Sequence, residues 1–275
     1  MHSPLPTSTQ VVFVGGGNMA TAILRGLVAQ GFPGQNITVI EPTAESRVRL
    51  EQDFGVRTLA AADASVSTAS VVVWAIKPQI FAEAAIPVQP HTRQALHISV
   101  AAGIPIQSIE GWVQSRRIVR CMPNTPAQIG LGIAGLVAGS AVSAEDRALT
   151  QAILSPTGQL MWVDSEQQLD ALMTISGSGP AYVFFWIEAL MQGGQALGLS
   201  AEQARILAAY TFVGAANLVL QSDESPELLR QRVTSKGGTT HEAITTMQER
   251  GVTEAIVAAQ RACYERGIEL GKQFA

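Results

Sequence analysis

The stretch that decides the fold lies near the start of the chain and reads "VVFVGGGNMATAILRGLVAQG", residues 11–31. Its first four residues are β-branched or aromatic, which predicts a short buried strand. Three glycines follow, and the apolar residues after them recur at helical spacing. A strand, a glycine turn and a helix in this order are the arrangement with which parallel sheets bind dinucleotides.

The glycine turn carries the pattern G-x-G-x-x-A, formed by Gly15, Gly17 and Ala20. The first glycine permits a tight turn, the second lets the backbone approach a pyrophosphate, and the alanine allows close packing of helix on sheet. The pyrophosphate would lie at the helix N-terminus, where backbone N–H groups have no partner. The pattern alone is weak, but strand, turn, helix and second strand all follow in order. The predicted cofactor contacts are Gly15, Gly16, Gly17, Asn18, Met19 and Ala20.

The second apolar run ends in "VIEPTAESR", residues 39–47, where the residue that reads the adenosine ribose is expected. A carboxylate at Glu41 would accept hydrogen bonds from the ribose hydroxyls of NADH and would repel the 2′-phosphate of NADPH. Thr43 and Arg47 favour the opposite outcome, because a hydroxyl and a guanidinium can bind that phosphate. We expect Glu41 and Thr43 to contact the cofactor, and the choice between NADPH and NADH stays open.

Strand-like and helix-like segments alternate from about residue 10 to residue 164, which is typical of a βαβ sheet. The strand-like runs are "VVFVG", "ITVIE", "SVVVWAI", "ALHISVA", "RIVRCM", "AGLVAG" and "QLMWVD". After residue 164 only helical spacing remains; Pro180 suits a helix start, and Ser200 with Gln203 forms a capping box. We therefore predict an α/β chain, with an N-terminal Rossmann dinucleotide-binding domain at residues 1–164 and an all-helical domain at 165–275.

Composition restricts the class of protein. The chain has 275 residues, of which 47% are hydrophobic and 15% charged, and its net charge is -4, which indicates a globular protein and argues against a nucleic-acid surface. Its two cysteines cannot build a disulfide framework or a multi-cysteine metal site, so no metal is expected. No signal peptide pattern opens the chain, and apolar runs such as "GIAGLVAGSAV" are shorter than the ~20 residues that cross a bilayer. We expect a soluble, cytoplasmic protein with no membrane or nucleic-acid partner.

Two predicted helices are apolar on nearly every face: "AYVFFWIEAL", residues 181–190, and "ILAAYTFVGAANLVL", residues 206–220. A helix of this kind packs against other helices all round. A small helical domain has too little core to bury both. We therefore expect a homodimer that assembles into a higher homo-oligomer.

The helical half is interrupted by "VTSKGGTTHEAI", residues 233–244. Adjacent Gly237 and Gly238 are costly inside a helix, so they predict a turn that exposes backbone N–H groups, with Thr239 or Thr240 capping the next helix. A plain helix–helix corner is the alternative. Such a turn can also bind a carboxylate. Because an iminium arrives already protonated, reduction of a C=N bond needs no strong catalytic base, and hydroxyls and N–H groups suffice.

Six motifs, spread between about residues 11 and 272, together resemble the pyrroline-5-carboxylate reductase family. They are "VGGGNMA", "AIKPQ", "SVAAGI", "RCMPNTP", "SGSGPAY" and "VTSKGGTTHEAI". The resemblance implies a Rossmann domain followed by a helical dimerisation domain. It also implies an enzyme that uses NADPH or NADH to reduce L-1-pyrroline-5-carboxylate to L-proline, the final step of proline biosynthesis.

The resemblance also implies roles for single residues. Gly238, Thr239 and Thr240 match the groups whose N–H atoms hold the substrate carboxylate, with Ser235 beside them, and the catalytic Thr240 hydroxyl matches the group that contacts the ring nitrogen. The residues expected to line the nicotinamide half and the floor of the cleft are Ala75, Ile76, Lys77, Pro78 and Asn124. The chain departs from many relatives at Lys236, where they have proline, and at Glu41.

Two other classes of protein share some of these features. A β-hydroxyacid dehydrogenase shares the layout but places a catalytic lysine within a helix of its second domain, and Lys77, Lys236 and Lys272 do not lie in such a place. A non-catalytic NAD(P)-binding sensor would keep the glycine turn but would not need a carboxylate-binding corner. An assay with pyrroline-5-carboxylate and both reduced nicotinamides separates the three classes.

Overall fold

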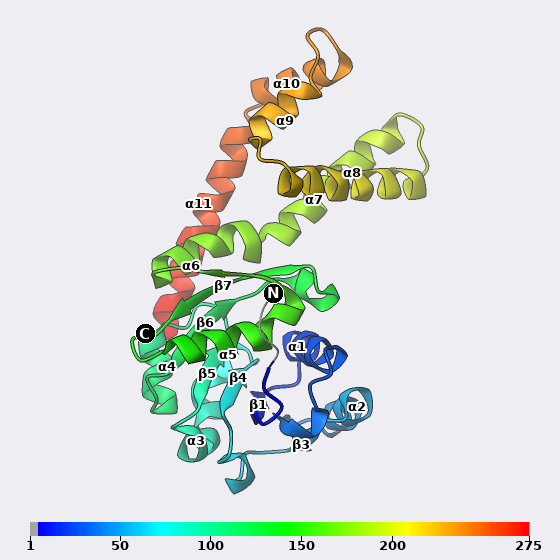
Figure 1. Cartoon of the computed structure of the whole chain (residues 1–275). Coiled ribbons are helices and arrows are strands. Elements are labelled where there is room, and N and C mark those ends of the chain that lie inside the picture. The colour runs from blue at the N-terminus through cyan, green and yellow to red at the C-terminus, as the bar shows by residue number, and fades with distance from the viewer. Residues whose placement is uncertain (1–4, 275) are drawn as a thin grey trace. The chain divides into compact units, whose positions relative to one another are not determined.

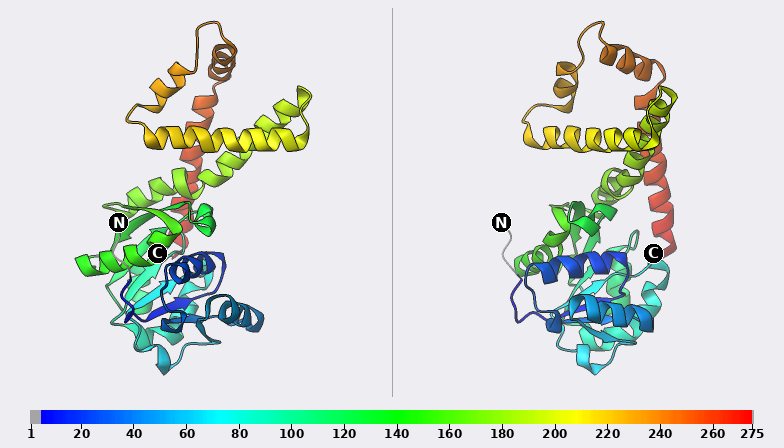
Figure 2. Two further views of the ribbon diagram at one scale, coloured as in Figure 1. Left: turned by 45° about the vertical axis from the view of Figure 1, so that its right-hand side comes forward. Right: turned by 90° about the vertical axis from the view of Figure 1, so that its right-hand side faces the viewer.

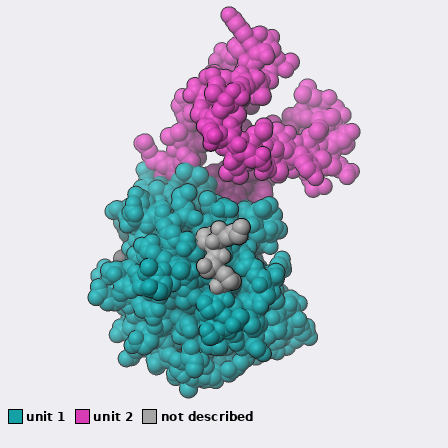
Figure 3. All heavy atoms as spheres, viewed as in Figure 1, with its two compact units in different colours: residues 1–177, 264–275 teal, residues 178–263 magenta. Residues whose placement is uncertain are grey.

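The computed structural model describes residues 5–274, which form two compact units (Figures 1 and 3). The first unit contains residues 5–177 and 264–274, and the second contains residues 178–263. Helix α6 (Glu166–Leu172) packs with the first unit, as does the end of the last helix. The boundaries of the compact units therefore differ from those of the expected domains, 1–164 and 165–275. The expected domains remain a prediction of which part binds the cofactor and which part dimerises.

The first unit is built on one eight-stranded sheet with the strand order β3-β2-β1-β4-β5-β6-β7-β8. Its strands are β1 (Val11–Val14), β2 (Ile37–Ile40), β3 (Arg57–Leu59), β4 (Val71–Trp74), β5 (Leu96–Ser99), β6 (Ile118–Met122), β7 (Gly132–Ala138) and β8 (Gly158–Trp162). All neighbours pair in parallel except β6 and β7, which are antiparallel. The strand order reverses between β1 and β4, the place where open α/β sheets bind ligands.

The seven expected strands are all present, and the sequence interpretation missed one more. Strand β3 is a three-residue edge strand, "RTL", with an exposed arginine and no fully buried position. It lacks the apolar run that marks β1 and β4, both of which are buried at every position because helices cover both faces of the sheet.

Helices flank this sheet (Figure 1), and short helical segments lie between or beyond them. The helices are α1 (Asn18–Ala29), α2 (Ala44–Phe54), α3 (Phe81–Thr92), α4 (Ile106–Val113), α5 (Ala144–Leu154) and α6. The short segments are η1 (Gly34–Asn36), η2 (Ala64–Val66), η3 (Pro78–Ile80), η4 (Thr125–Ile129), η5 (Ser155–Thr157), the π-helical η6 (Met173–Gly177) and η7 (Lys272–Phe274). Buried residues form two hydrophobic clusters, one containing side chains of α1, α2 and α5 and the other side chains of α3 and α4.

A polar pair lies inside the second of these clusters. The indole N–H of Trp74 donates to Nδ1 of His97 over 3.0 Å, and Nε2 of His97 lies 3.0 Å from the carbonyl oxygen of Thr92. Because that carbonyl can only accept, the proton of the neutral imidazole belongs on Nε2. Both side chains are fully buried, and burial lowers the pKa of His97 to about 4. Trp74 also stacks on Phe81 at a ring separation of 4.6 Å.

The described part of the second unit is helical (Figure 2). Its helices are α7 (Gly179–Ala196), α8 (Ala201–Gln221), α9 (Pro226–Arg232), α10 (Thr239–Glu249) and most of α11 (Val252–Gly271). Pro180 lies in the first turn of α7, and the Ser200–Gln203 capping box is formed at the start of α8, which confirms both predictions. Helices α7 and α8 pack against each other.

Helix α8 is unusually exposed for its composition. It has a mean hydropathy of 1.2 over an 18-residue stretch, of which 11% is buried. By length and composition it is the one helix among the described residues that could cross a membrane. The expectation from the sequence rests on shorter apolar runs, so this property of α8 was not expected. Ala204 and Ala208 are its buried residues, whereas Leu207, Tyr210 and Leu220 are exposed.

Candidate active site

The glycine turn between β1 and α1 is shaped by close packing. Gly15 has a φ of +93°, and a Cβ placed on it would lie 2.6 Å from the carbonyl oxygen of Ala75 and 2.7 Å from Cγ2 of Ile76. A Cβ on Gly16 would lie 2.5 Å from Cδ1 of Leu50. Gly15 therefore excludes a side chain, because a backbone carbonyl blocks it and its φ is left-handed, whereas a side chain at Gly16 would require the buried Leu50 to shift.

The third glycine of the turn is open. No atom lies within 4 Å of a Cβ placed on Gly17, which is the N-cap of α1 and provides no side-chain cap. Within residues 5–274, the N–H groups of Asn18, Met19 and Ala20 have no hydrogen-bond partner. Free N–H groups behind an unobstructed glycine fit a pyrophosphate, which the helix dipole also favours.

Glu41 lies at the end of β2 and ties that strand to the glycine turn. Its Oε2 accepts a hydrogen bond from the Gly16 N–H over 3.0 Å, and its Oε1 accepts one from the Thr43 N–H over 2.9 Å. Arg47 donates through Nη1 to the carbonyl oxygens of Glu41 and Pro42, over 2.9 and 2.7 Å. The carboxylate predicted to read the ribose is thus held beside the pyrophosphate turn.

A cavity of about 630 Å³ lies in the first unit at the carboxyl ends of β1 and β2. Its volume is that of a site for a small molecule or cofactor. The residues that line it are Val14, Gly15, Ile40, Glu41, Pro42, Ala60, Ala61, Ala62, Ile76, Ile80, Glu83, Ala84, Pro87 and Val88. Three predicted contacts, Gly15, Glu41 and Ile76, come together here, and the apolar lining suits an adenine ring.

The remaining predicted cofactor residues lie near this turn or farther along the sheet. Ala75 follows β4 directly, and Lys77 is exposed at the N-cap of η3, which begins at Pro78. Asn124 is buried, and both ends of its side-chain amide have a partner: Nδ2 donates to the Ser176 carbonyl over 3.1 Å, and Oδ1 accepts from the Ile133 N–H over 3.0 Å. The geometry gives the Asn124 side chain a positioning task, and its direct contact with cofactor stays a prediction.

The C-terminal glycine corner, residues 235–240, is a turn followed by an uncapped helix. Gly237 has a φ of +72°, and the Gly238 N–H donates to the Ser235 carbonyl over 2.9 Å. Gly238 is the N-cap of α10, so the expectation that Thr239 or Thr240 caps the helix is wrong. Both threonines already have helical backbone geometry, and a residue inside the helix cannot cap it.

The groups of this corner point to anion binding. Within residues 5–274, the N–H groups of Thr239, Thr240 and His241 and the hydroxyls of both threonines have no hydrogen-bond partner. Thr239, Thr240 and Ser235 are exposed. The sequence interpretation gave no role to His241, whose Nδ1 is buried without a hydrogen bond. The sequence could have indicated His241, because this residue lies in the first turn of the helix that follows the glycine pair.

The "RCMPNTP" motif also contains a buried cation. The guanidinium of Arg120 forms ion pairs with Glu166 and Asp170, and the Glu166 carboxylate also accepts from the Ile106 N–H over 2.9 Å. Burial raises the pKa of Asp170 despite the neighbouring cation. This cluster links β6 to α6 and α4, so the arginine of the motif has a structural task.

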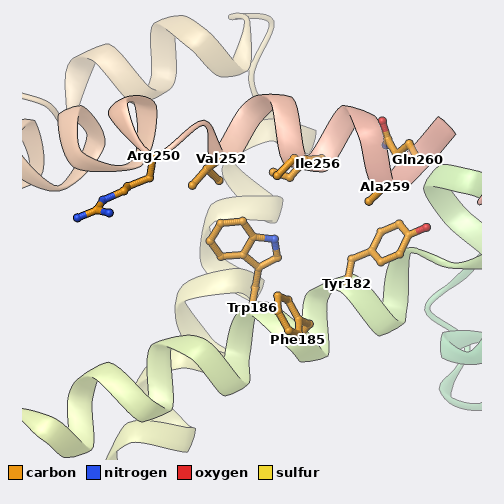
Figure 4. A pocket seen from close by; sticks show the side chains of 9 residues that line it. Tyr182, Phe185, Trp186, Arg250, Val252, Ile256, Ala259 and Gln260 are labelled. Atoms are coloured by element: carbon orange, nitrogen blue, oxygen red, sulfur yellow. The ribbon is translucent and has the colours of Figure 1, made fainter. Parts of the chain in front are cut away.

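The second unit has an apolar cavity of its own, about 370 Å³ in volume, between α7 and α11 (Figure 4). Its lining residues are Tyr182, Phe185, Trp186, Arg250, Val252, Ala255, Ile256, Ala259 and Gln260. Trp186 projects from α7 into the space beside Val252 and Ile256 of α11 (Figure 4). The cavity lacks the convergent polar groups of a substrate site, and it suits apolar side chains.

The sheet, the glycine turn and the cavity beside it define a dinucleotide-dependent oxidoreductase with a helical second part. Comparison with family models agrees with this class. A model for "NADP oxidoreductase coenzyme F420-dependent" proteins matches residues 10–103, and one for "Pyrroline-5-carboxylate reductase dimerisation" matches residues 166–270.

Relatives extend the match over almost the whole chain. A pyrroline-5-carboxylate reductase of Pseudomonas aeruginosa is 40% identical over 98% of this chain and 99% of its own length, and one of Arabidopsis thaliana is 34% identical over 98% of each. A solved pyrroline-5-carboxylate reductase of Coxiella burnetii has a TM-score of 0.87 at 36% identity and covers 95% of this chain and 98% of its own. The Plasmodium falciparum enzyme, solved with NADP bound, has a TM-score of 0.84 at 25% identity, covering 96% and 99%. This chain belongs to the pyrroline-5-carboxylate reductase family.

Proposed function

We propose that this chain is an NAD(P)H-dependent enzyme that reduces L-1-pyrroline-5-carboxylate to L-proline, the last step of proline biosynthesis. The observation that carries the proposal is the C-terminal glycine corner, because a glycine turn after β1 is common to many oxidoreductases. The corner supplies uncapped N–H groups and a free hydroxyl in a family whose relatives bear this enzyme's name. A substrate with a carboxylate beside a C=N bond needs both kinds of group, N–H groups for the carboxylate and a hydroxyl near the nitrogen.

The first unit would hold the cofactor. The free N–H groups at the start of α1 would bind the pyrophosphate, and the cavity beside Glu41 would take the adenosine half. Residues 75–78 would line the nicotinamide half. When bound, a reduced nicotinamide supplies the hydride for the C=N carbon.

The corner would hold the substrate. The N–H groups of Thr239 and Thr240 would bind its carboxylate, with Ser235 at the edge of the turn, and the Thr240 hydroxyl would donate a hydrogen bond to the ring nitrogen or relay its proton. Lys236 is exposed in the same turn, where a cation favours an anionic substrate. Binding both ends of the ring fixes the face that receives the hydride.

The helical part would form a homodimer, which assembles into a higher homo-oligomer. Large apolar side chains of α7 and α8 are exposed, among them Phe184, Phe185, Leu207, Tyr210 and Leu220. The dimerisation model spans both helices, so a second copy is the occupant that this surface favours over a bilayer. We expect a cytoplasmic enzyme that is at least dimeric, and light scattering that finds an active monomer at working concentration would contradict this.

The decisive experiment is an assay with L-1-pyrroline-5-carboxylate and each reduced nicotinamide, which follows nicotinamide oxidation and proline formation together. We expect stoichiometric proline. A β-hydroxyacid dehydrogenase would instead turn over a hydroxy acid, and a non-catalytic sensor would bind the nicotinamide without turnover. Either result would reject the proposed reaction.

A further inference from the structure

We propose that this chain selects NADH over NADPH and that Glu41 is the residue that selects. The inference rests on the proposed function only in taking the first unit to bind a reduced nicotinamide. It concerns the adenosine end of the cofactor, where NADPH carries a 2′-phosphate and NADH a free hydroxyl.

The first step of the argument is that the Glu41 carboxylate is held in place. Both of its oxygens accept backbone N–H groups, one from Gly16 and one from Thr43, over 3.0 and 2.9 Å. A Cβ on Gly16 would come within 3.3 Å of Oε2, so the glycine and the carboxylate fit each other closely. Moving the carboxylate away to admit a phosphate would leave the partly buried N–H group of Gly16 without this partner, which is costly, and would also release the exposed N–H group of Thr43.

The second step is the charge of the cavity. Of the described residues that line it, Glu41 and Glu83 are ionisable and both are acidic; lysine, arginine and histidine are absent from that lining. A 2′-phosphate would therefore enter the field of two carboxylates, with no basic residue among those that line the cavity. Like charges placed together oppose binding strongly.

The third step concerns Arg47, the cation that the sequence offers as a phosphate ligand. Its Nη1 donates to the carbonyl oxygens of Glu41 and Pro42, and the residue does not line the cavity. The guanidinium thus stabilises the backbone that directly follows β2. With Nη1 engaged in this way, Arg47 is anchored to the backbone after β2 and is not among the residues that line the cavity.

The same carboxylate favours a free ribose. An ionised carboxylate has about four acceptor positions, and Glu41 uses two of them on backbone N–H groups. The others remain for ribose hydroxyls, which are donors. Glu41 therefore attracts the neutral diol of NADH at the position where it repels the phosphate of NADPH.

Binding measurements without substrate test this inference. We expect the Kd of NADPH, from cofactor fluorescence titration of the intact enzyme, to exceed that of NADH by at least about tenfold, which is ~1.4 kcal/mol. Competition by ADP and 2′,5′-ADP should show the same ratio, which places the selection at the adenosine end. Equal affinities, or tighter NADPH, would overturn the inference whether or not the chain reduces pyrroline-5-carboxylate.

Single substitutions test whether Glu41 is the residue that selects NADH over NADPH. Glu41→Ser should bring the NADPH/NADH ratio of Kd values to about unity, mostly through tighter NADPH, whereas Glu83→Gln at the exposed rim should shift it only about twofold. Glu45→Gln, a carboxylate in the first turn of α2 that does not line the cavity, is the matched control and should leave the ratio unchanged. A folded Glu41→Ser protein with the wild-type ratio would remove Glu41 from the proposal. If this variant does not fold, the ADP and 2′,5′-ADP ratio of the wild type still decides the preference.

Discussion

The two glycine turns of this molecule both leave the first N–H groups of a helix free for a ligand, but they differ in how closely they are packed. Each precedes a helix whose first N–H groups have no cap, α1 in one case and α10 in the other. The turn after β1 is packed, since a Cβ on Gly15 or Gly16 would collide with neighbouring atoms. The corner at Gly237 is open, with no atom within 4 Å of a Cβ placed there, and only its φ of +72° calls for glycine.

This difference indicates what each turn depends on. The first is shaped by the sheet and by the Glu41 carboxylate before any ligand is bound, so binding there needs little rearrangement. The second has its backbone conformation but little packing around it. We therefore expect changes in the first turn to affect stability and cofactor binding together, and changes in the corner to affect mainly substrate chemistry.

The largest expected effect is at Thr240. Thr240→Ala should lower kcat/KM for pyrroline-5-carboxylate by roughly ten- to a thousandfold, because it removes one preorganised hydroxyl at the reacting nitrogen. Thr240→Ser keeps the oxygen and should retain most activity. Thr246→Ala, an exposed threonine of the same helix, is the control and should behave as wild type. Near wild-type kinetics in Thr240→Ala would contradict the catalytic role of Thr240 and would leave the corner with a structural role only.

The packed turn should be sensitive to one methyl group. Gly15→Ala combines left-handed strain of about 1–2 kcal/mol with overpacking of about 1–3 kcal/mol, so the free energy of unfolding should fall by about 2–5 kcal/mol. NADH binding should weaken at least about tenfold. Gly31→Ala is the matched control, because Gly31 has a φ of +84° but nothing within 4 Å. It should lose only the strain, as denaturant unfolding would show. Equal losses in the two variants would mean that packing does not shape the turn.

Acid should act on the first unit through His97. The unfolded side chain has a pKa near 6.5 and the folded one about 4, so the unfolded state takes up the proton first as the pH falls. The His97 contribution to the free energy of unfolding is therefore complete above pH 6.5 and should be lost by up to ~3 kcal/mol toward pH 4. His97→Gln retains a carbonyl acceptor for Trp74 and should flatten the pH dependence in this range. An unchanged slope would show that other groups cause it.

The smallest expected effect is at the open corner. Gly237→Ala meets no neighbour, so only the left-handed strain remains, and the melting temperature should fall by an amount that corresponds to about 1 kcal/mol. NADH binding should not change, whereas KM for the substrate should rise as the N–H groups shift. A loss of stability as large as that of Gly15→Ala would erase the contrast between the two turns.

The sequence predicted most of the fold because the central strands are apolar at nearly every position. It missed β3, whose Arg57 and Thr58 lack that pattern, and it could not show that β7 runs antiparallel to β6, since the composition of a strand carries no direction. Of the candidate site, local features such as the glycine fingerprint and the turn at Gly237 were predictable. The link between Gly16 and Glu41 was not, because it joins residues 25 positions apart and depends on the register of β1 against β2.

The role assigned to the corner remains a prediction that the kinetic variants will test, and the role of residues 75–78 also remains a prediction. Asn124 shows how such assignments can shift. A motif residue expected at the floor of the cleft has a side chain whose hydrogen bonds join three segments, through Ser176 and Ile133. Only the packed structure shows that its amide already has partners.

The apolar cavity between α7 and α11 has an optical consequence. Trp186 is the one tryptophan of residues 178–263, whereas Trp74, Trp112 and Trp162 all belong to the first unit. Replacing those three with phenylalanine would leave an emission spectrum that reports on the helical unit alone. Because Trp186 lines an open cavity, its emission maximum should move to shorter wavelength when a second copy excludes water from the cavity. A dilution series would therefore follow the association of the chains as a shift of this maximum.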